Sequence, residues 1–169
     1  FQVANTPNMD ALISNASYTW DAMNDGITSS GPGWSSLLTG VWPNKHGIVD
    51  NSFFGSNLGQ YPHLFKRIED YDPSLHTVSI VQWHPINNNI ATGFVDTMIN
   101  VADHSDFVGT ATVEYLTNAD PDAIFIHFDD VDHAGHGSGF TPNNPNYISA
   151  IEDVDENVGY IITALNNRP

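Results

Sequence analysis

The chain has 169 residues, 40% of them hydrophobic in type, a size that suits one domain with a sizeable core. Four basic residues stand against twenty acidic ones, and the formal net charge is -16. Because non-specific nucleic-acid binding requires Lys and Arg to neutralise phosphates, this charge excludes electrostatic binding of nucleic acid. No apolar run approaches the roughly 20 residues that cross a bilayer, so no membrane segment is predicted in this chain. The sequence has no cysteine, so any metal must be held by His, carboxylates, hydroxyls or water.

The first third of the chain predicts two helices and one strand. A helix over residues 7–16 begins with Pro7 at its first position. A strand is expected over residues 16–20. Turn residues then precede a short helix over 34–40 that ends at a glycine, which puts Ser30 at a helix N-terminus.

The rest of the chain alternates helical and strand patterns. The expected elements are a helix over 62–71, a buried strand over 77–81, a helix over 104–117, an apolar strand over 123–128 and a helix over 145–166. Such alternation predicts an α/β fold, a mostly parallel sheet layered by helices.

The segment 129–137 after the last predicted strand is expected to form a loop and is a candidate metal site. It holds three carboxylates and two imidazoles: Asp129, Asp130, Asp132, His133 and His136. Ligands of an open α/β sheet bind beyond the carboxyl ends of its strands, and Asp with neutral His suits zinc. Two alternatives remain, a solvated acidic turn and a calcium loop built on the three carboxylates, although the imidazoles argue against calcium.

Ser30 is the second candidate. A hydroxyl at a helix N-terminus beside glycines can approach an anionic group closely, while the helix dipole and free amides stabilise added negative charge. A plain Ser-Gly-Pro turn is the alternative interpretation of the same residues.

Several motifs in fixed order give the chain a resemblance to a known family. They are Asn5-Thr6-Pro7-Asn8-Met9-Asp10-Ala11-Leu12, Ser30-Gly31-Pro32, Leu38-Thr39-Gly40, Pro43, His46-Gly47-Ile48, Asn51, and Asp132 to His136 as Asp-x-x-Gly-His. Together they resemble the alkaline phosphatase superfamily, in particular the branch of type I phosphodiesterases and nucleotide pyrophosphatases. The resemblance implies the sheet of the alkaline phosphatase type and a metal-dependent hydrolase of phosphate esters with two divalent ions, zinc first among them.

The resemblance also assigns roles to five residues. Ser30 would be the nucleophile, bound to one zinc ion and phosphorylated during turnover. Asp132 and His136 would bind the other zinc. The backbone amide of Gly31 and the side-chain amide of Asn51 would donate hydrogen bonds to the phosphate oxygens. The substrate would be a small phosphate ester.

The chain departs from the family pattern at both ends. Relatives begin with a strand that ends in a metal-binding Asp, and they continue into an Asp-His pair and a later His. We therefore expect residues 1–169 to form a single partial domain, the first half of a catalytic domain. Four residues receive no role from the resemblance: His46, Asp129, Asp130 and His133.

Other functions within and outside the superfamily stay open. A monoester phosphatase or a phosphonate hydrolase differs only in pocket residues that the sequence does not assign. A sulfatase is disfavoured, since sulfatases typically place an Arg where this chain has Trp34. A non-catalytic metal-binding remnant is the alternative from another class. Relatives of this kind are commonly exported, which predicts an extracellular or periplasmic location.

Overall fold

A computed structural model describes residues 3–24, 26–102 and 104–168 of the chain. In chain order the elements are α1 (Pro7–Ile13), α2 (Ser30–Thr39), α3 (Pro43–His46), α4 (Leu64–Tyr71), β1 (Thr77–Val81), the π-helix η1 (Ile86–Ala91), β2 (Thr97–Asn100), α5 (Ser105–Asn118), β3 (Ala123–His127), α6 (Asp130–Ser138) and α7 (Pro145–Asn166). Among the described helices, none is both long and apolar enough to span a bilayer.

The described strands form one parallel sheet in the order β2-β1-β3. Val78 is the partner of Thr97 in β2 and of Ile124 in β3. All five residues of the central strand β1 are buried, as its β-branched run predicts for a strand covered on both faces. The α/β fold class predicted from the sequence is confirmed.

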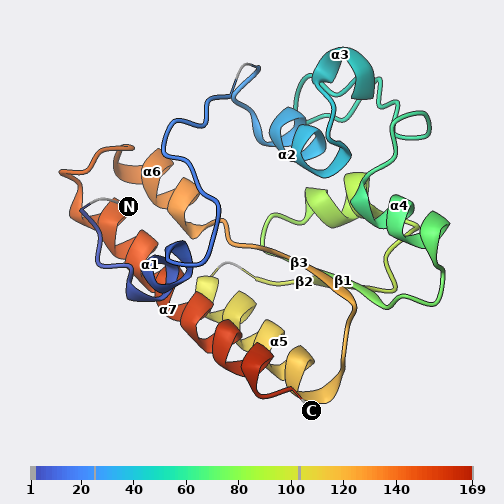
Figure 1. The fold of residues 1–169 in the computed structure, drawn as a ribbon. Helices are drawn as coiled ribbons and strands as arrows, with labels where there is room; N and C mark the ends of the chain where they lie inside the picture. The colour runs from blue at the N-terminus through green and yellow to red at the C-terminus, as the bar shows by residue number, and fades with distance from the viewer. Residues whose placement is uncertain (1–2, 25, 103, 169) are drawn as a thin grey trace.

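Helices cover both faces of this sheet (Figure 1). On one face Val81 of β1 packs with Leu38 of α2 and with Ile86 and Ile90 of η1. On the other face the core contains Val78 and Ile80 of β1, Val101, and Val108 of α5. Since alternate side chains of a strand point to opposite faces, β1 supplies both cores.

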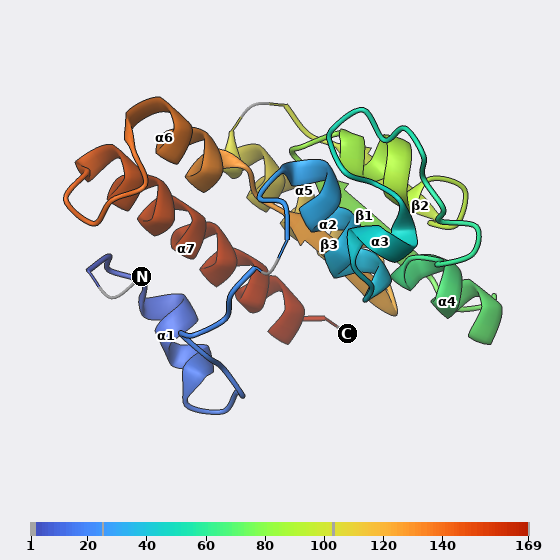
Figure 2. The same cartoon turned by 90° about the horizontal axis from the view of Figure 1, so that it is seen from above.

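The long helix α7 packs beside α5, and α1 packs against α7 in turn (Figure 2). The carboxylate of Asp155, which is 2% exposed on α7, accepts hydrogen bonds from the backbone amides of Asn8 (3.1 Å) and Met9 (2.8 Å). These are unpaired amides of the first turn of α1, so a side chain from α7 completes that helix end.

Two predicted helices have other bounds, since α1 ends at Ile13 rather than at residue 16 and α2 begins at Ser30 rather than at residue 34. The sequence interpretation was wrong at two further places. Residues 16–20 form no strand, because the segment pairs with no strand in the described part of the chain, and the Tyr18 and Trp20 rings pack edge to face instead. The segment 129–137, expected as a loop, forms the helix α6. Asp130 and Asp132 in its first turn favour a helix, although glycine, present at positions 135 and 137, disfavours one.

Three short elements were not predicted: α3, η1 and β2. The π-helix η1 contains Asn87, which is 1% exposed. Its side chain accepts a hydrogen bond from Ser79 Oγ (2.6 Å) and donates to Asn100 Oδ1 (2.9 Å), so it links β1 to the end of β2. Long-range polar contacts of this kind leave no periodic pattern in the sequence.

Candidate active site

A pocket of about 510 Å³ lies at the carboxyl end of β3. Its lining comes from α2 and the segment before it, from the end of β3 and from α6, with Asn51 added by the loop after α3. Ser30, Asn51, Asp132 and His136, which come from distant parts of the sequence, all line it. The structure therefore brings four of the five predicted site residues to one cavity, at the edge of the sheet where α/β proteins bind ligands.

Ser30 is the first residue of α2, and Ser29 before it is extended. The first amides of a helix have no partner within the helix, and their dipoles favour negative charge nearby. The glycine expected to end this helix does so, since Gly40 has the left-handed φ of 71°. The placement of Ser30 at a helix N-terminus is confirmed.

Gly31, the fifth predicted site residue, is hydrogen-bonded to Asn51. Its backbone N–H donates to Asn51 Oδ1 at 2.7 Å, and Ser29 Oγ donates to the same oxygen at 3.0 Å. A Cβ at position 31 would lie 2.6 Å from the carbonyl oxygen of Asp50, so only glycine allows this approach. The Asn51 carboxamide is thereby held against the start of α2, and within the described chain its Nδ2 donates to no protein group.

Asp132 and His136 lie one turn apart on α6, with Asp132 Oδ2 and His136 Nε2 separated by 3.4 Å. Zinc bonds of about 2.0–2.1 Å at tetrahedral angles place two ligand atoms about 3.3 Å apart, so this pair fits one zinc ion. The two side chains are 56% and 73% exposed, and both line the pocket. In residues 3–24, 26–102 and 104–168, no three His, Asp or Glu side chains gather around one possible ion position, including the three carboxylates of the calcium alternative.

Gly135 and Phe140 explain the glycine of the Asp-x-x-Gly-His motif. The Phe140 ring lies so close to α6 that a Cβ at position 135 would come within 2.1 Å of it. The same ring packs edge to face on the His136 imidazole, with centroids 5.2 Å apart. The glycine therefore lets an aromatic ring support the predicted ligand.

His127 is a pocket residue that the sequence interpretation missed. Burial lowers the pKa of His127 to about 4, so its imidazole is neutral near pH 7. Its ring packs edge to face on Trp34, with centroids 4.6 Å apart, and Trp34 also lines the pocket. A histidine ending an apolar strand directly before the acidic segment was the signal that could have identified it.

Asp129 lies between His127 and α6, with its Oδ1 3.8 Å from His127 Nε2. Burial, together with the negative charges of Asp132 and Asp130, raises the pKa of Asp129 above its ordinary value. Gln82 Oε1 accepts a hydrogen bond from the Asp129 amide at 2.7 Å, which ties the end of β3 to β1. Acidic charge is therefore concentrated on the α6 side of the pocket, opposite the amides of α2.

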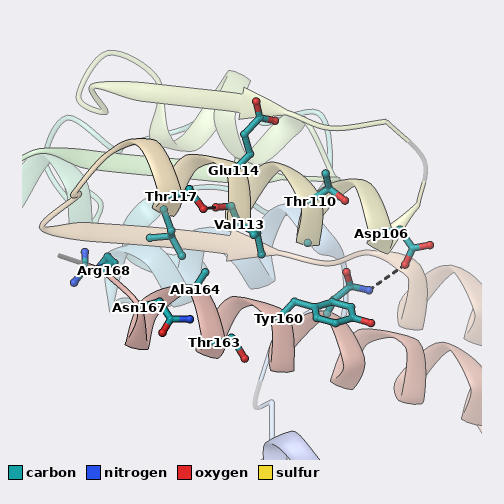
Figure 3. A pocket seen from close by; sticks show the side chains of 13 residues that line it. Asp106, Thr110, Val113, Glu114, Thr117, Tyr160, Thr163, Ala164, Asn167 and Arg168 are labelled. Carbon is teal, nitrogen blue, oxygen red and sulfur yellow. Dashed lines mark hydrogen bonds between the residues drawn. The ribbon is translucent and has the colours of Figure 1, made fainter.

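A larger cavity, of about 800 Å³, lies between α5 and α7 (Figure 3). Val113, Thr117, Tyr160 and Ala164 are among the side chains that line it. None of the five predicted site residues is among its described lining residues. The smaller pocket is the candidate active site, since it holds the groups with hydrolytic chemistry.

The sequence was compared with known families and curated proteins. The family described as type I phosphodiesterase / nucleotide pyrophosphatase matches residues 1–90 and 62–169. The chain is 23% identical to the bis(5'-adenosyl)-triphosphatase ENPP4 of Bos taurus, over 94% of this chain and 39% of that protein. It is 22% identical to ectonucleotide pyrophosphatase/phosphodiesterase family member 5 of Homo sapiens, over 95% of this chain and 37% of that protein. The chain thus spans well under half the length of these relatives.

The fold was compared with solved structures. Murine ectonucleotide pyrophosphatase / phosphodiesterase 5 matches with a TM-score of 0.74 and 22% identity, over 97% of this chain and 48% of that one. Phosphonoacetate hydrolase from Sinorhizobium meliloti 1021, in complex with phosphonoacetate, matches with a TM-score of 0.55 and 18% identity, over 80% of this chain and 42% of that one. These likenesses show a shared fold. Because the family match covers the chain from end to end, the protein belongs to the type I phosphodiesterase / nucleotide pyrophosphatase family.

Proposed function

We propose that this chain supplies one half of the active site of a phosphoric ester hydrolase, in which Ser30 is the nucleophile. One observation carries the proposal: Ser30 at the N-terminus of α2 shares a single pocket with Asn51, Asp132 and His136. A nucleophilic hydroxyl, an amide donor and a carboxylate–imidazole pair are the groups that phosphoryl transfer requires. The names of the relatives, a bis(5'-adenosyl)-triphosphatase and a nucleotide pyrophosphatase/phosphodiesterase, agree with this reaction class.

In the first step Ser30 Oγ attacks phosphorus and the bond to the leaving group breaks. The serine is then phosphorylated, and the proton that the Ser30 hydroxyl loses is balanced by the proton that the leaving oxygen takes up. In the second step a water oxygen attacks the phospho-Ser30 phosphorus, the bond to Oγ breaks, and Oγ takes up a proton in place of the one that the water loses. The free hydroxyl of Ser30 and inorganic or monoesterified phosphate result, so the enzyme returns to its starting state.

The start of α2 binds the phosphate in this mechanism. Asn51 Nδ2 donates to a non-bridging oxygen. The Gly31 amide was expected to donate to the phosphate as well, but it donates to Asn51 Oδ1, so its role in this proposal is to hold Asn51. Preorganised donors of this kind stabilise the charge that develops in the transition state. The unpaired amides of the first turn of α2 add to the same positive potential.

Asp132 and His136 would hold one divalent ion, zinc by the chemistry of the pair, and Ser30 would contribute to a second ion. When bound, two such ions supply Lewis-acid stabilisation of the serine alkoxide and of the leaving oxygen. The half-buried Asp129 beside α6 adds negative charge that favours a cation at this position.

We propose an extracellular or periplasmic location, in keeping with the word "ectonucleotide" in the name of one relative.

The first experiment replaces the nucleophile in the complete protein. Ser30→Ala is expected to lower kcat for an aryl phosphate diester by at least about 10³-fold while the bound zinc is retained. Ser35→Ala is the matched control, since this buried hydroxyl of the same helix has no hydrogen-bond partner in the described chain. Undiminished turnover in Ser30→Ala would overturn the proposal. A wild-type protein that binds zinc and turns over no ester would show the non-catalytic remnant instead.

A panel of three substrates defines the ester class. Aryl phosphate diesters, aryl phosphate monoesters and a phosphonate are compared by kcat/KM on the same preparation. The highest value for diesters is the expected result for this family. A preference for monoesters or phosphonates would keep Ser30 as the nucleophile and change the substrate assignment.

A further inference from the structure

His46 is fully buried and has both ring nitrogens bonded inside the protein. Its Nδ1 accepts a hydrogen bond from the backbone amide of Ile48 at 3.1 Å. A neutral imidazole that accepts at Nδ1 carries its hydrogen on Nε2, so Nε2 donates to Ser36 Oγ, 2.9 Å away. Burial lowers the pKa of His46, which keeps the ring in this neutral form. His46 therefore does not reach a substrate, and it joins α3 to the middle of α2.

The backbone of residues 46–48 packs closely against its neighbours. Gly47 has a left-handed φ of 78°, and a Cβ there would lie 2.2 Å from the carbonyl oxygen of Gly55. The carbonyl oxygen of His46 accepts a hydrogen bond from the amide of Asn57 at 2.8 Å. Ile48 is completely buried. These contacts fix the backbone conformation of residues 46–48.

At Asn51 the same segment contacts α2 a second time. Asp50 Oδ1 accepts a hydrogen bond from the Ser52 amide at 2.8 Å, which closes a tight turn around Asn51. Asn51 Oδ1 then accepts the Gly31 amide at 2.7 Å. The segment 46–51 is thus tied to α2 at Ser36 and at Gly31, about 7–8 Å apart along the helix axis.

We infer that His46 is a positioning residue, whose bond to Ser36 sets the 46–51 segment so that Asn51 meets the start of α2 in one orientation. The inference that His46 holds Asn51 rests on geometry alone. Its consequence for turnover rests on the proposed function, since Asn51 is the phosphate donor there. Misplacement of a donor by about 1 Å can cost on the order of 10²-fold in rate.

The positioning role is better tested at Ser36 than at His46, because replacing a fully buried histidine can unfold the segment. Ser36→Ala removes only the acceptor of His46 Nε2–H, and Ser35→Ala removes a neighbouring buried hydroxyl that has no partner in the described chain. In the complete protein, Ser36→Ala is expected to lower kcat about tenfold with KM within about twofold, since Asn51 acts on transition-state charge. Ser35→Ala is expected to match the wild type.

A double-mutant cycle separates positioning from general weakening. In the Asn51→Ala background, Ser36→Ala is expected to have no further effect on kcat, because its influence passes through Asn51. An equal tenfold loss in both backgrounds would overturn the inference, as would an unchanged kcat in Ser36→Ala alone.

Amide hydrogen exchange provides the readout that does not depend on activity. The Gly31 amide, bonded to Asn51, is expected to exchange about tenfold faster in Ser36→Ala than in Ser35→Ala. Equal exchange rates in the two variants would overturn the positioning role. If Ser30→Ala keeps full turnover, the proposed function fails, and the exchange rates still decide whether His46 positions Asn51.

Discussion

Gly31 occupies the closest approach between the start of α2 and the turn that carries Asn51. Gly31→Ala would place a Cβ 2.6 Å from the Asp50 carbonyl oxygen and 3.1 Å from Asn51 Oδ1, so the turn must move away. We expect kcat/KM to fall by about 10–100-fold, since a donor displaced from the phosphate loses its transition-state contact. Steady-state kinetics of the variant measures this effect.

Gly33 on the same helix is the control for the stability of Gly31→Ala. A Cβ there meets nothing within 4 Å, and alanine in a helix is favoured over glycine by about 1 kcal/mol. Gly33→Ala is therefore expected to raise the melting temperature while Gly31→Ala lowers it. Equal shifts in the two variants would show that the contact with Asp50 has no structural weight.

The site could be assigned from the sequence only as far as motif order allowed. Ser30, Asn51, Asp132 and His136 stand in motifs, and the structure places all four on one pocket. The roles of these residues in catalysis stay predictions. His127 belongs to no motif, and its place beside Trp34 depends on α2 lying over β3, a contact between distant segments that a local pattern does not encode.

At the scale of elements, α1 is held by a side chain from α7. Asp155→Ala removes the carboxylate that accepts the amides of Asn8 and Met9, and it leaves those donors without a partner. We expect the free energy of unfolding to fall by about 2–3 kcal/mol, the scale of a charge-assisted, buried hydrogen-bond pair. Asp153→Ala, an exposed position on the same helix, is the control and should change it by less than about 0.5 kcal/mol in urea unfolding.

Helix α4 begins with a titratable cap. His63 is 3% exposed, and its Nδ1 accepts the Lys66 amide at 3.5 Å. Burial, with a smaller contribution from the charge of Lys66, lowers the pKa of His63 to about 4. The unfolded chain, with an ordinary histidine pKa of about 6.5, binds the proton more readily, so stability is lost as the pH falls from about 6.5 to about 4.

The variant His63→Asn keeps a capping acceptor that does not titrate. Between about pH 7 and about pH 4, the wild type should lose about 1–2 kcal/mol more stability than this variant, a value reduced for solvent screening. Urea unfolding at the two pH values measures the difference. A parallel loss in both proteins would show that other groups, and not His63, cause the acid sensitivity.

The sequence predicted long elements well and short ones poorly. Strand β1 and helix α7 have the predicted bounds, because a continuous β-branched run and an apolar period along 22 residues are strong local signals. Helix α6 was missed because its glycines oppose helix formation, while the packing of the Phe140 ring on Gly135 leaves no helical period in the sequence. Strand β2 has four residues and forms by pairing with β1, which its own sequence does not reveal.

The whole molecule has a formal net charge of -16, and self-repulsion of that size opposes a compact state. Ion pairs such as Lys66–Asp70 and Arg168–Asp120 involve only the scarce basic residues, so added salt screens repulsion more than attraction. We expect the melting temperature to rise when sodium chloride increases from about 10 mM to about 1 M, as the Debye length falls from about 30 Å to about 3 Å.

Thermal unfolding in sodium chloride and in the larger, weakly interacting salt tetramethylammonium chloride separates screening from specific ion binding. Screening predicts similar rises in both salts. A fall in the melting temperature would mean that the ion pairs outweigh the repulsion.

The cap that Asp155 places on α1 also determines when α1 can become stable. With seven residues, α1 is shorter than the roughly 12–15 that make an isolated helix even marginal in water. The residue that completes its first turn lies 147 positions later in the chain. During synthesis the segment 7–13 therefore leaves the ribosome before α7, and it has no capping carboxylate until α7 has been made. Its docking is a late event in folding, and the N-terminal segment stays accessible to chaperones and proteases until then.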